Sequence, residues 1–145
     1  MVGTTGSDSL AGWSGQDWIF GFEGIDELIG ANWNDFLFGG GDQDWIYGEQ
    51  GIDELNGETG NDWLFGQGDQ DWIYGGAGDD FLDGGTGNDF LFGGAGQDRL
   101  YGGAGSDYFV FSSVEDAGAN ANRGDCKSRS NNPSQKRLVC LAAPD

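Results

Sequence analysis

The chain has 145 residues, of which 30 are glycine and only 2 are proline, and glycine does not recur at every third position, so collagen is excluded. The chain has 25 acidic residues, 6 basic residues and no histidine, which gives a net charge of -19. This charge excludes nucleic acid and disfavours an anionic membrane surface as partners. Ten Phe, six Trp and four Tyr, regularly spaced, indicate a chain that folds once its acids are neutralised, most simply by a metal cation.

The N-terminal residues predict no cleaved leader. Residues 1–5 lack the basic region and the apolar segment of a signal peptide. No apolar run approaches the ~20 residues needed to span a bilayer. Cys126 and Cys140 lie outside the repetitive part of the chain, so they form at most a small disulfide and say nothing about the core fold.

A nine-residue repeat begins at Gly3 and continues to Val110 without an insertion or a deletion. The first position is glycine in all twelve units, the fourth is glycine in nine, and the eighth is always large and apolar. The units read GTTGSDSLA, GWSGQDWIF, GFEGIDELI, GANWNDFLF, GGGDQDWIY, GEQGIDELN, GETGNDWLF, GQGDQDWIY, GGAGDDFLD, GGTGNDFLF, GGAGQDRLY and GGAGSDYFV. An array of this regularity sets the fold, because each unit must share a core with its neighbours.

The sixth position is the second invariant feature of the repeat. It is aspartate in every unit: Asp8, Asp17, Asp26, Asp35, Asp44, Asp53, Asp62, Asp71, Asp80, Asp89, Asp98 and Asp107. The glycines that precede it supply backbone conformations with positive φ, so the first six residues of each unit are predicted to form a turn. The last three residues are predicted to form a short strand with its middle side chain facing inward.

The pattern GGxGxDxUx, with U a large apolar residue, resembles the RTX (repeats-in-toxin) nonapeptide family, and the four units from Gly75 to Val110 match it most closely. The resemblance implies an all-β, right-handed parallel β-roll with two nonapeptides in each 18-residue coil, about six coils in all. It also implies calcium ions between neighbouring turns. The expected ligands are the twelve aspartates and the backbone of the turn glycines in the best-matching units, namely Gly76, Gly78, Gly85, Gly87, Gly94 and Gly96.

Calcium suits this pattern because it takes six to eight oxygen ligands and accepts carboxylates together with backbone carbonyls. Two units per coil place every second aspartate on the same edge, which gives two columns of six. Neighbouring carboxylates about 4.8 Å apart repel each other unless a dication lies between them. Five gaps in each column predict up to about ten ions. Asx turns explain an occasional aspartate, but they do not explain aspartate at the same position of all twelve units.

Three units depart from the pattern at the fourth position, where they carry Trp33, Asp42 and Asp69. Aspartate tolerates left-handed backbone geometry and adds a possible ligand. A bulky residue with positive φ is strained. The turn at Trp33 is therefore predicted to be the weakest site.

Outward-facing strand positions are unusually aromatic. One sheet is predicted to show Trp18/Phe20, Phe36/Phe38, Glu54/Asn56, Trp72/Tyr74, Phe90/Phe92 and Tyr108/Val110, and the other sheet is less apolar. Three interpretations stay open: ladders that stabilise the strands, burial against a second copy or a neighbouring domain, and a glycan-binding platform.

The period ends after Phe111, and residues 112–145 hold five of the six basic residues and both prolines. We therefore expect a repeat domain at residues 1–111 and a disordered tail at residues 112–145. Relatives of this family are commonly exported by type I secretion, so the resemblance implies an extracellular protein secreted without a signal peptide.

The leading functional hypothesis is a calcium-binding module that folds when it meets extracellular calcium. One alternative is adhesion or self-association through the aromatic faces, to a glycan, a surface or a second copy. Another is the repeat region of a larger secreted enzyme or toxin. We expect no enzymatic activity within the chain, because histidine, a reactive cysteine context and a zinc motif are missing from the sequence.

Overall fold

A computed structural model describes residues 1–111, 126–128 and 138–141 of the chain, and it consists of two β-sheets. The six-stranded sheet has the order β1-β3-β5-β7-β9-β11, and the eight-stranded sheet has the order β13-β14-β12-β10-β8-β6-β4-β2. The strands are β1 (Ser9–Ala11), β2 (Trp18–Glu23), β3 (Glu27–Asn32), β4 (Phe36–Gly41), β5 (Trp45–Gln50), β6 (Glu54–Thr59), β7 (Trp63–Gly68), β8 (Trp72–Ala77), β9 (Phe81–Thr86), β10 (Phe90–Ala95), β11 (Arg99–Tyr101), β12 (Tyr108–Phe111), β13 (Cys126–Ser128) and β14 (Leu138–Leu141).

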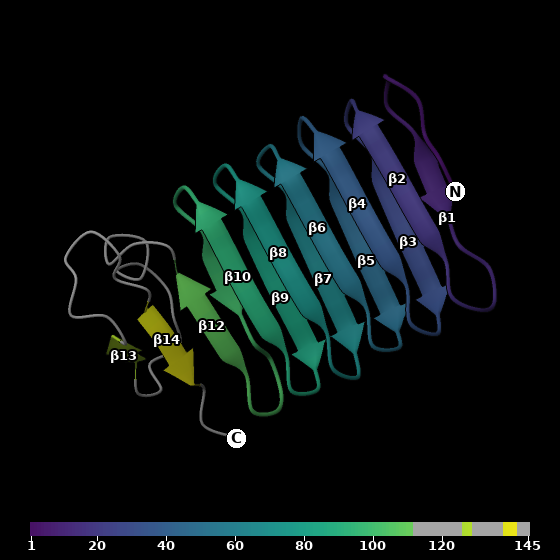
Figure 1. Ribbon diagram of the computed structural model, residues 1–145. Helices are drawn as coiled ribbons and strands as arrows, with labels where there is room; N and C mark the ends of the chain where they lie inside the picture. Colours follow the sequence, from purple (N-terminus) through teal and green to yellow (C-terminus); the bar gives the residue numbers. More distant parts are fainter. Residues whose placement is uncertain (112–125, 129–137, 142–145) are drawn as a thin grey trace.

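Strands β1 to β12 alternate between the two sheets, and each is parallel to the strand two places later in the chain. Register partners are 18 residues apart, as in the pairs Ser9 with Glu27 and Phe90 with Tyr108. Two nonapeptides therefore make one coil, and about six coils stack into a β-solenoid (Figure 1). The predicted all-β parallel architecture with its 18-residue period is confirmed.

The strands are longer than the repeat pattern predicts. A typical strand has six residues, which are positions seven to nine of one unit and positions one to three of the next. The prediction of a three-residue strand and a six-residue turn is wrong, because the ladder of hydrogen bonds continues through the glycine at position one. Only positions four to six form the turn, and the sixth is the invariant aspartate.

The core between the sheets is a single row of large apolar side chains from each sheet. Every unit after the first contributes one fully buried residue from its eighth position: Ile19, Leu28, Leu37, Ile46, Leu55, Leu64, Ile73, Leu82, Leu91, Leu100 and Phe109. Burying a side chain of this size contributes roughly 1.5–3 kcal/mol. A single strand cannot bury its inward residue alone, so stability depends on the stacking of coils.

Positive φ angles fall on the second and fourth positions of the units. Trp33 has φ 82°, and Asp42 and Asp69 have φ 70° and 68°, so the strain predicted at Trp33 is present. Phe22, at a second position, has φ 80°. Each such non-glycine residue costs roughly 1–2 kcal/mol relative to glycine.

At the C-terminal end, β12 is followed in its sheet by two short antiparallel strands, β14 and β13. Cys126 and Cys140 are register partners in this pair. Disorder was predicted for residues 112–145; the seven-residue portion in β13 and β14 is strand instead, and the remainder lies outside the described residues. The described segments contain no helix of the length and apolarity needed to cross a membrane.

Candidate metal centre

The invariant aspartates stand in two columns, one along each edge of the solenoid, because their positions recur every 18 residues. Within a column the backbone N–H of each aspartate donates to Oδ1 of the aspartate one coil later, at 2.7 Å from Asp8 to Asp26 and 2.9 Å from Asp44 to Asp62. The other column does the same, at 2.7 Å from Asp17 to Asp35 and 3.0 Å from Asp89 to Asp107. From Asp26 onward, one carboxylate oxygen of each aspartate thus links its own coil to the preceding one.

The second carboxylate oxygen has no comparable partner. Oδ2 is buried and accepts no hydrogen bond in ten of the aspartates, namely Asp26, Asp35, Asp44, Asp53, Asp62, Asp71, Asp80, Asp89, Asp98 and Asp107. In the first coil, by contrast, Oδ2 of Asp8 and Asp17 accepts the N–H of Thr4 and Trp13 at 2.7 and 2.8 Å. A buried carboxylate oxygen without a partner is strongly unfavourable, so ten together require a compensating ligand or proton.

The invariant first glycine explains how the carboxylates fit. A Cβ added to Gly57 would lie 2.3 Å from Oδ2 of Asp62 and 2.5 Å from the carbonyl oxygen of Gly75. The same two kinds of neighbour crowd Gly39 and Gly66. Position one therefore faces inward and excludes a side chain for steric reasons, rather than supplying the positive φ that the repeat pattern predicted for it.

Replacement of this glycine tests the steric reason. Gly57→Ala is expected to lower the free energy of unfolding in calcium by roughly 3 kcal/mol, the upper end for overpacking, because one of the crowded atoms belongs to the backbone. Gly68→Ala is the control, because its added Cβ would meet no atom closer than 3.2 Å and other units carry alanine at the same position. Denaturant unfolding measures both, and equal effects would contradict the steric interpretation.

Burial is the main influence on the pKa values of the column aspartates. Desolvation raises the pKa of Asp71 to about 8, of Asp44 and Asp62 to about 7, and of Asp53, Asp80 and Asp89 to about 6. The N–H from the preceding coil lowers each pKa, and neighbouring carboxylates raise it further. Desolvation also raises the pKa of Asp26, Asp35 and Asp107. The folded state therefore favours a proton or a cation on these carboxylates.

Carboxylates alone do not make a complete site. Among the residues that the structure describes, no three acidic, histidine or cysteine side chains gather closely enough to hold a metal ion. A cation in either column needs backbone carbonyl oxygens as well, and calcium readily accepts this mixture. The unpartnered Oδ2 atoms and the mixed oxygen donors fit calcium.

Of the six glycines predicted as ligands, Gly78, Gly87 and Gly96 lie in the turns with the aspartates, whereas Gly76, Gly85 and Gly94 lie near the ends of strands β8, β9 and β10. Gly76, Gly85 and Gly94 occupy second positions with φ 111°, 93° and 106°, whereas Gly78, Gly87 and Gly96 occupy fourth positions with φ 141°, 143° and 139°. The carbonyl oxygen of Gly76 points along the stack, 2.0 Å from where a Cβ of Gly94 would lie, and that of Gly78 lies 1.9 Å from the Cβ position of Gly96. Carbonyls and carboxylates thus share each edge.

One part of the turns is not apparent from the repeat pattern. At the fifth position, side-chain oxygens accept the backbone N–H of the next coil: Asn34 from Ile52 at 3.0 Å, and Asp79 from Gln97 at 2.8 Å. The only signal in the sequence is the recurrence of Asn, Asp and Ser at this position. These bonds hold neighbouring turns together beside the aspartate columns.

The repeat region matches a known protein family. The model of the RTX calcium-binding nonapeptide repeat matches four times, at residues 1–28, 20–55, 47–82 and 74–109. The chain belongs to the RTX family. No curated protein matches the chain as a whole.

Membership of the RTX family makes the chain a calcium-binding repeat module. RTX repeats bind calcium, and the series of buried aspartates fits that property. A calcium-binding β-solenoid of this kind is typically structural rather than catalytic. RTX repeat proteins are generally extracellular.

Proposed function

We propose that this chain is a secreted RTX module that folds when it binds extracellular calcium. The observation that carries the proposal is the set of ten buried Oδ2 atoms that accept no hydrogen bond. Stacking the coils brings these oxygens out of water, and no hydrogen bond from the described residues replaces the lost contact with water. Calcium supplies the compensation, so ion binding and stacking are coupled.

The residues that hold the ions are the column aspartates Asp8, Asp17, Asp26, Asp35, Asp44, Asp53, Asp62, Asp71, Asp80, Asp89, Asp98 and Asp107, with backbone carbonyls of the turn glycines, including Gly76, Gly78, Gly85, Gly87, Gly94 and Gly96. Bound calcium neutralises the buried carboxylates and links neighbouring turns. Six aspartates in each column leave five gaps, which supports up to about ten ions.

Secretion follows from the same chemistry. In calcium-poor cytosol the ionised aspartates repel one another and the chain stays unfolded, which suits export through a signal-peptide-independent route. Extracellular calcium then drives folding by mass action. The aspartates are committed to the ions, so the module acts by binding and not by catalysis.

Far-UV circular dichroism at pH 8 tests the proposal. In excess EDTA we expect a spectrum of an unfolded chain, and in millimolar calcium we expect a strand spectrum with steep cooperativity. Magnesium is the control, since its preference for octahedral geometry and retained water suits these turns poorly. The same strand spectrum in EDTA and in calcium would contradict the proposal.

A further inference from the structure

The aromatic face of the eight-stranded sheet is interrupted at one strand. Outward side chains of this sheet form two columns of rings, with centroids 4.3 Å apart for Trp18 and Phe36 and 5.0 Å apart for Phe20 and Phe38. Beyond the interruption, Trp72 stacks on Phe90 at 4.3 Å. The stacking predicted for this face is therefore present, except at β6.

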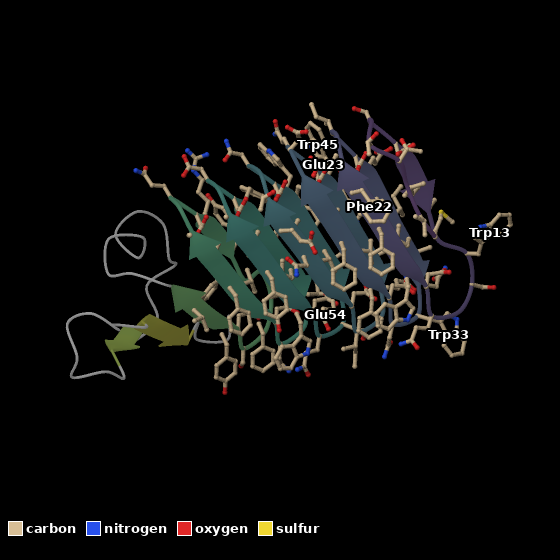
Figure 2. The ribbon with its side chains drawn as sticks, turned by 45° about the horizontal axis from the view of Figure 1, so that its top comes forward. Trp13, Phe22, Glu23, Trp33, Trp45 and Glu54 are labelled. Atoms are coloured by element: carbon tan, nitrogen blue, oxygen red, sulfur yellow. The ribbon has the colours of Figure 1, made fainter. Side chains whose placement is uncertain are left out.

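Strand β6 breaks both columns at once, because it carries Glu54 in one and Asn56 in the other. Glu54 is in register with Phe36 on one side and Trp72 on the other, and Asn56 is in register with Phe38 and Tyr74. Figure 2 shows Glu54 between the two groups of side chains on this face. Each group ends in rings that lack a neighbouring ring on the β6 side.

The gap has the dimensions of one missing layer of rings. Two strand spacings separate β4 from β8, which is roughly 9.6 Å. The stacked rings elsewhere on this sheet are 4.3–5.0 Å apart, so Phe36 and Trp72 do not stack on each other, and the partly buried side chain of Glu54 lies in the layer between them. Above that side chain, a flat group can contact both rings in the space between their outer ends. We call this space, bounded by Phe36, Phe38, Trp72 and Tyr74, the β6 slot.

Glu54 gives the β6 slot its charge. It is the one acidic residue among the two outward columns from Trp18 to Val110, and its side chain is only partly exposed. Burial, and then the negative charge of Glu54 on the neighbouring strand, raise the pKa of Tyr74. Within the described residues no basic side chain forms an ion pair with Glu54. The carboxylate is thus available to a cation that enters between the rings.

The other sheet has an interruption that is already closed. Asp83 separates Phe65 from Tyr101 in one column, but the ring of Phe81 tilts toward both, with centroids 5.7 Å from Phe65 and 5.2 Å from Tyr101. The backbone of Gly85 hydrogen-bonds to Asp83 and lowers its pKa, against a larger rise from burial. Among the described residues, strand β6 has neither a ring that fills its gap nor a hydrogen-bond donor to the carboxylate of Glu54.

We propose that the β6 slot binds a guanidinium group, such as an arginine side chain presented by a partner, which lies between the outer ends of the Phe36 and Trp72 rings and pairs with Glu54. A guanidinium is flat, stacks on aromatic faces and is weakly hydrated, whereas an ammonium is compact and strongly hydrated. Aromatic faces attract cations, and a carboxylate shielded by rings does so more strongly than one in water. The strongly acidic chain attracts a basic partner over longer range.

Titration of the full chain with N-acetyl-L-argininamide in millimolar calcium, followed by NMR chemical shifts, tests the proposal. We expect shifts of the Trp72 indole that saturate, and at least fivefold weaker binding of N-acetyl-L-lysinamide. Glu54→Gln is expected to weaken binding of the arginine probe about tenfold. The double change E54W/N56Y copies the Trp72/Tyr74 pair into β6, and it is expected to abolish binding by completing the ladder.

Glu27→Gln is the matched control, because Glu27 is an exposed carboxylate on the other sheet beside a single ring, that of Trp45. It is expected to leave the affinity unchanged. Three results would contradict binding at the β6 slot. They are unchanged binding by Glu54→Gln, an equal loss of affinity in Glu27→Gln, and the absence of saturating shifts. Circular dichroism in calcium separates these outcomes from a failure of the calcium-folding proposal, since each variant is required to show the strand spectrum of the parent chain.

Discussion

In the presence of a chelator, the free energy of unfolding of the solenoid is expected to fall steadily between about pH 4 and about pH 8. The cause is the buried aspartates, whose carboxyl pKa rises from 3.8 to about 8 at Asp71 and to about 6 or 7 at five others. A raised carboxyl pKa means that the folded chain holds its protons more tightly than the unfolded chain. Protonation therefore stabilises the fold at low pH, and this stabilisation is lost as the pH rises through the folded pKa values.

The expected size of this effect is large. Six buried carboxylates with raised pKa values act in the same direction, and the whole net stability of a typical domain is only ~5–15 kcal/mol. Without calcium the chain is expected to be folded near pH 5 and unfolded near pH 8.

Circular dichroism in EDTA across this pH range provides the measurement, and calcium at pH 8 is the control. Calcium is expected to restore the strand spectrum, because it neutralises the same oxygens, and its binding is expected to release protons below about pH 7. A metal-free chain whose stability rises with pH would contradict this account, since it would mean that the aspartates are not buried as carboxylates.

Much of the fold could be predicted from the period together with the resemblance to the RTX family. Nine residues with one invariant apolar position require stacking, and the parallel register of 18 residues places Asp26 beside Asp44 and Trp72 beside Phe90, as the two-unit coil predicts. The outward columns of rings were also predictable, because side chains alternate along a strand. Even the interruption at Glu54 and Asn56 is visible in the sequence.

The details of the turn could not be predicted in the same way. Glycine at position one suggested positive φ, yet the positive angles occur at position two, as at Glu49 and Gln67. Position one is glycine because Oδ2 of the aspartate five residues later lies against it, as at Gly57 and Asp62, and only coordinates show that contact. Glycine is invariant at position one for this steric reason. Position two tolerates side chains because they point outward.

The second large effect on stability is expected from substitution of Asp80, with its neighbour Asp79 as the comparison. Both residues are aspartate, but Asp80 is buried and Asp79 is exposed. Asp80→Asn keeps an Oδ1 that accepts the backbone N–H of Asp62, with 2.9 Å between the nitrogen and the oxygen. The change removes the carboxyl group, whose pKa is raised by burial to about 6. In EDTA near pH 5, where the metal-free chain is expected to be folded, this change is expected to leave stability unchanged or to raise it, because a buried asparagine needs no proton to be neutral.

In calcium the sign is expected to reverse. Asp80→Asn removes an anionic ligand, and a hundredfold loss of affinity at one site lowers stability by about 2.7 kcal/mol when the parent site is saturated. Asp79→Asn is the control: Asp79 is exposed, and asparagine retains the oxygen that accepts the N–H of Gln97 at 2.8 Å. That variant is expected to change stability by less than about 0.5 kcal/mol in either condition.

Denaturant unfolding of both variants, in EDTA near pH 5 and in calcium at pH 8, measures the four values. A structural role of Asp80 without an ion predicts the same sign of change in EDTA and in calcium, because the hydrogen bond from Asp62 is kept in both. Opposite signs for Asp80→Asn, with none for Asp79→Asn, assign the effect to a cation at the buried column. Equal effects of the two substitutions would mean that calcium responds only to the overall negative charge, and the columns would then not be its binding sites.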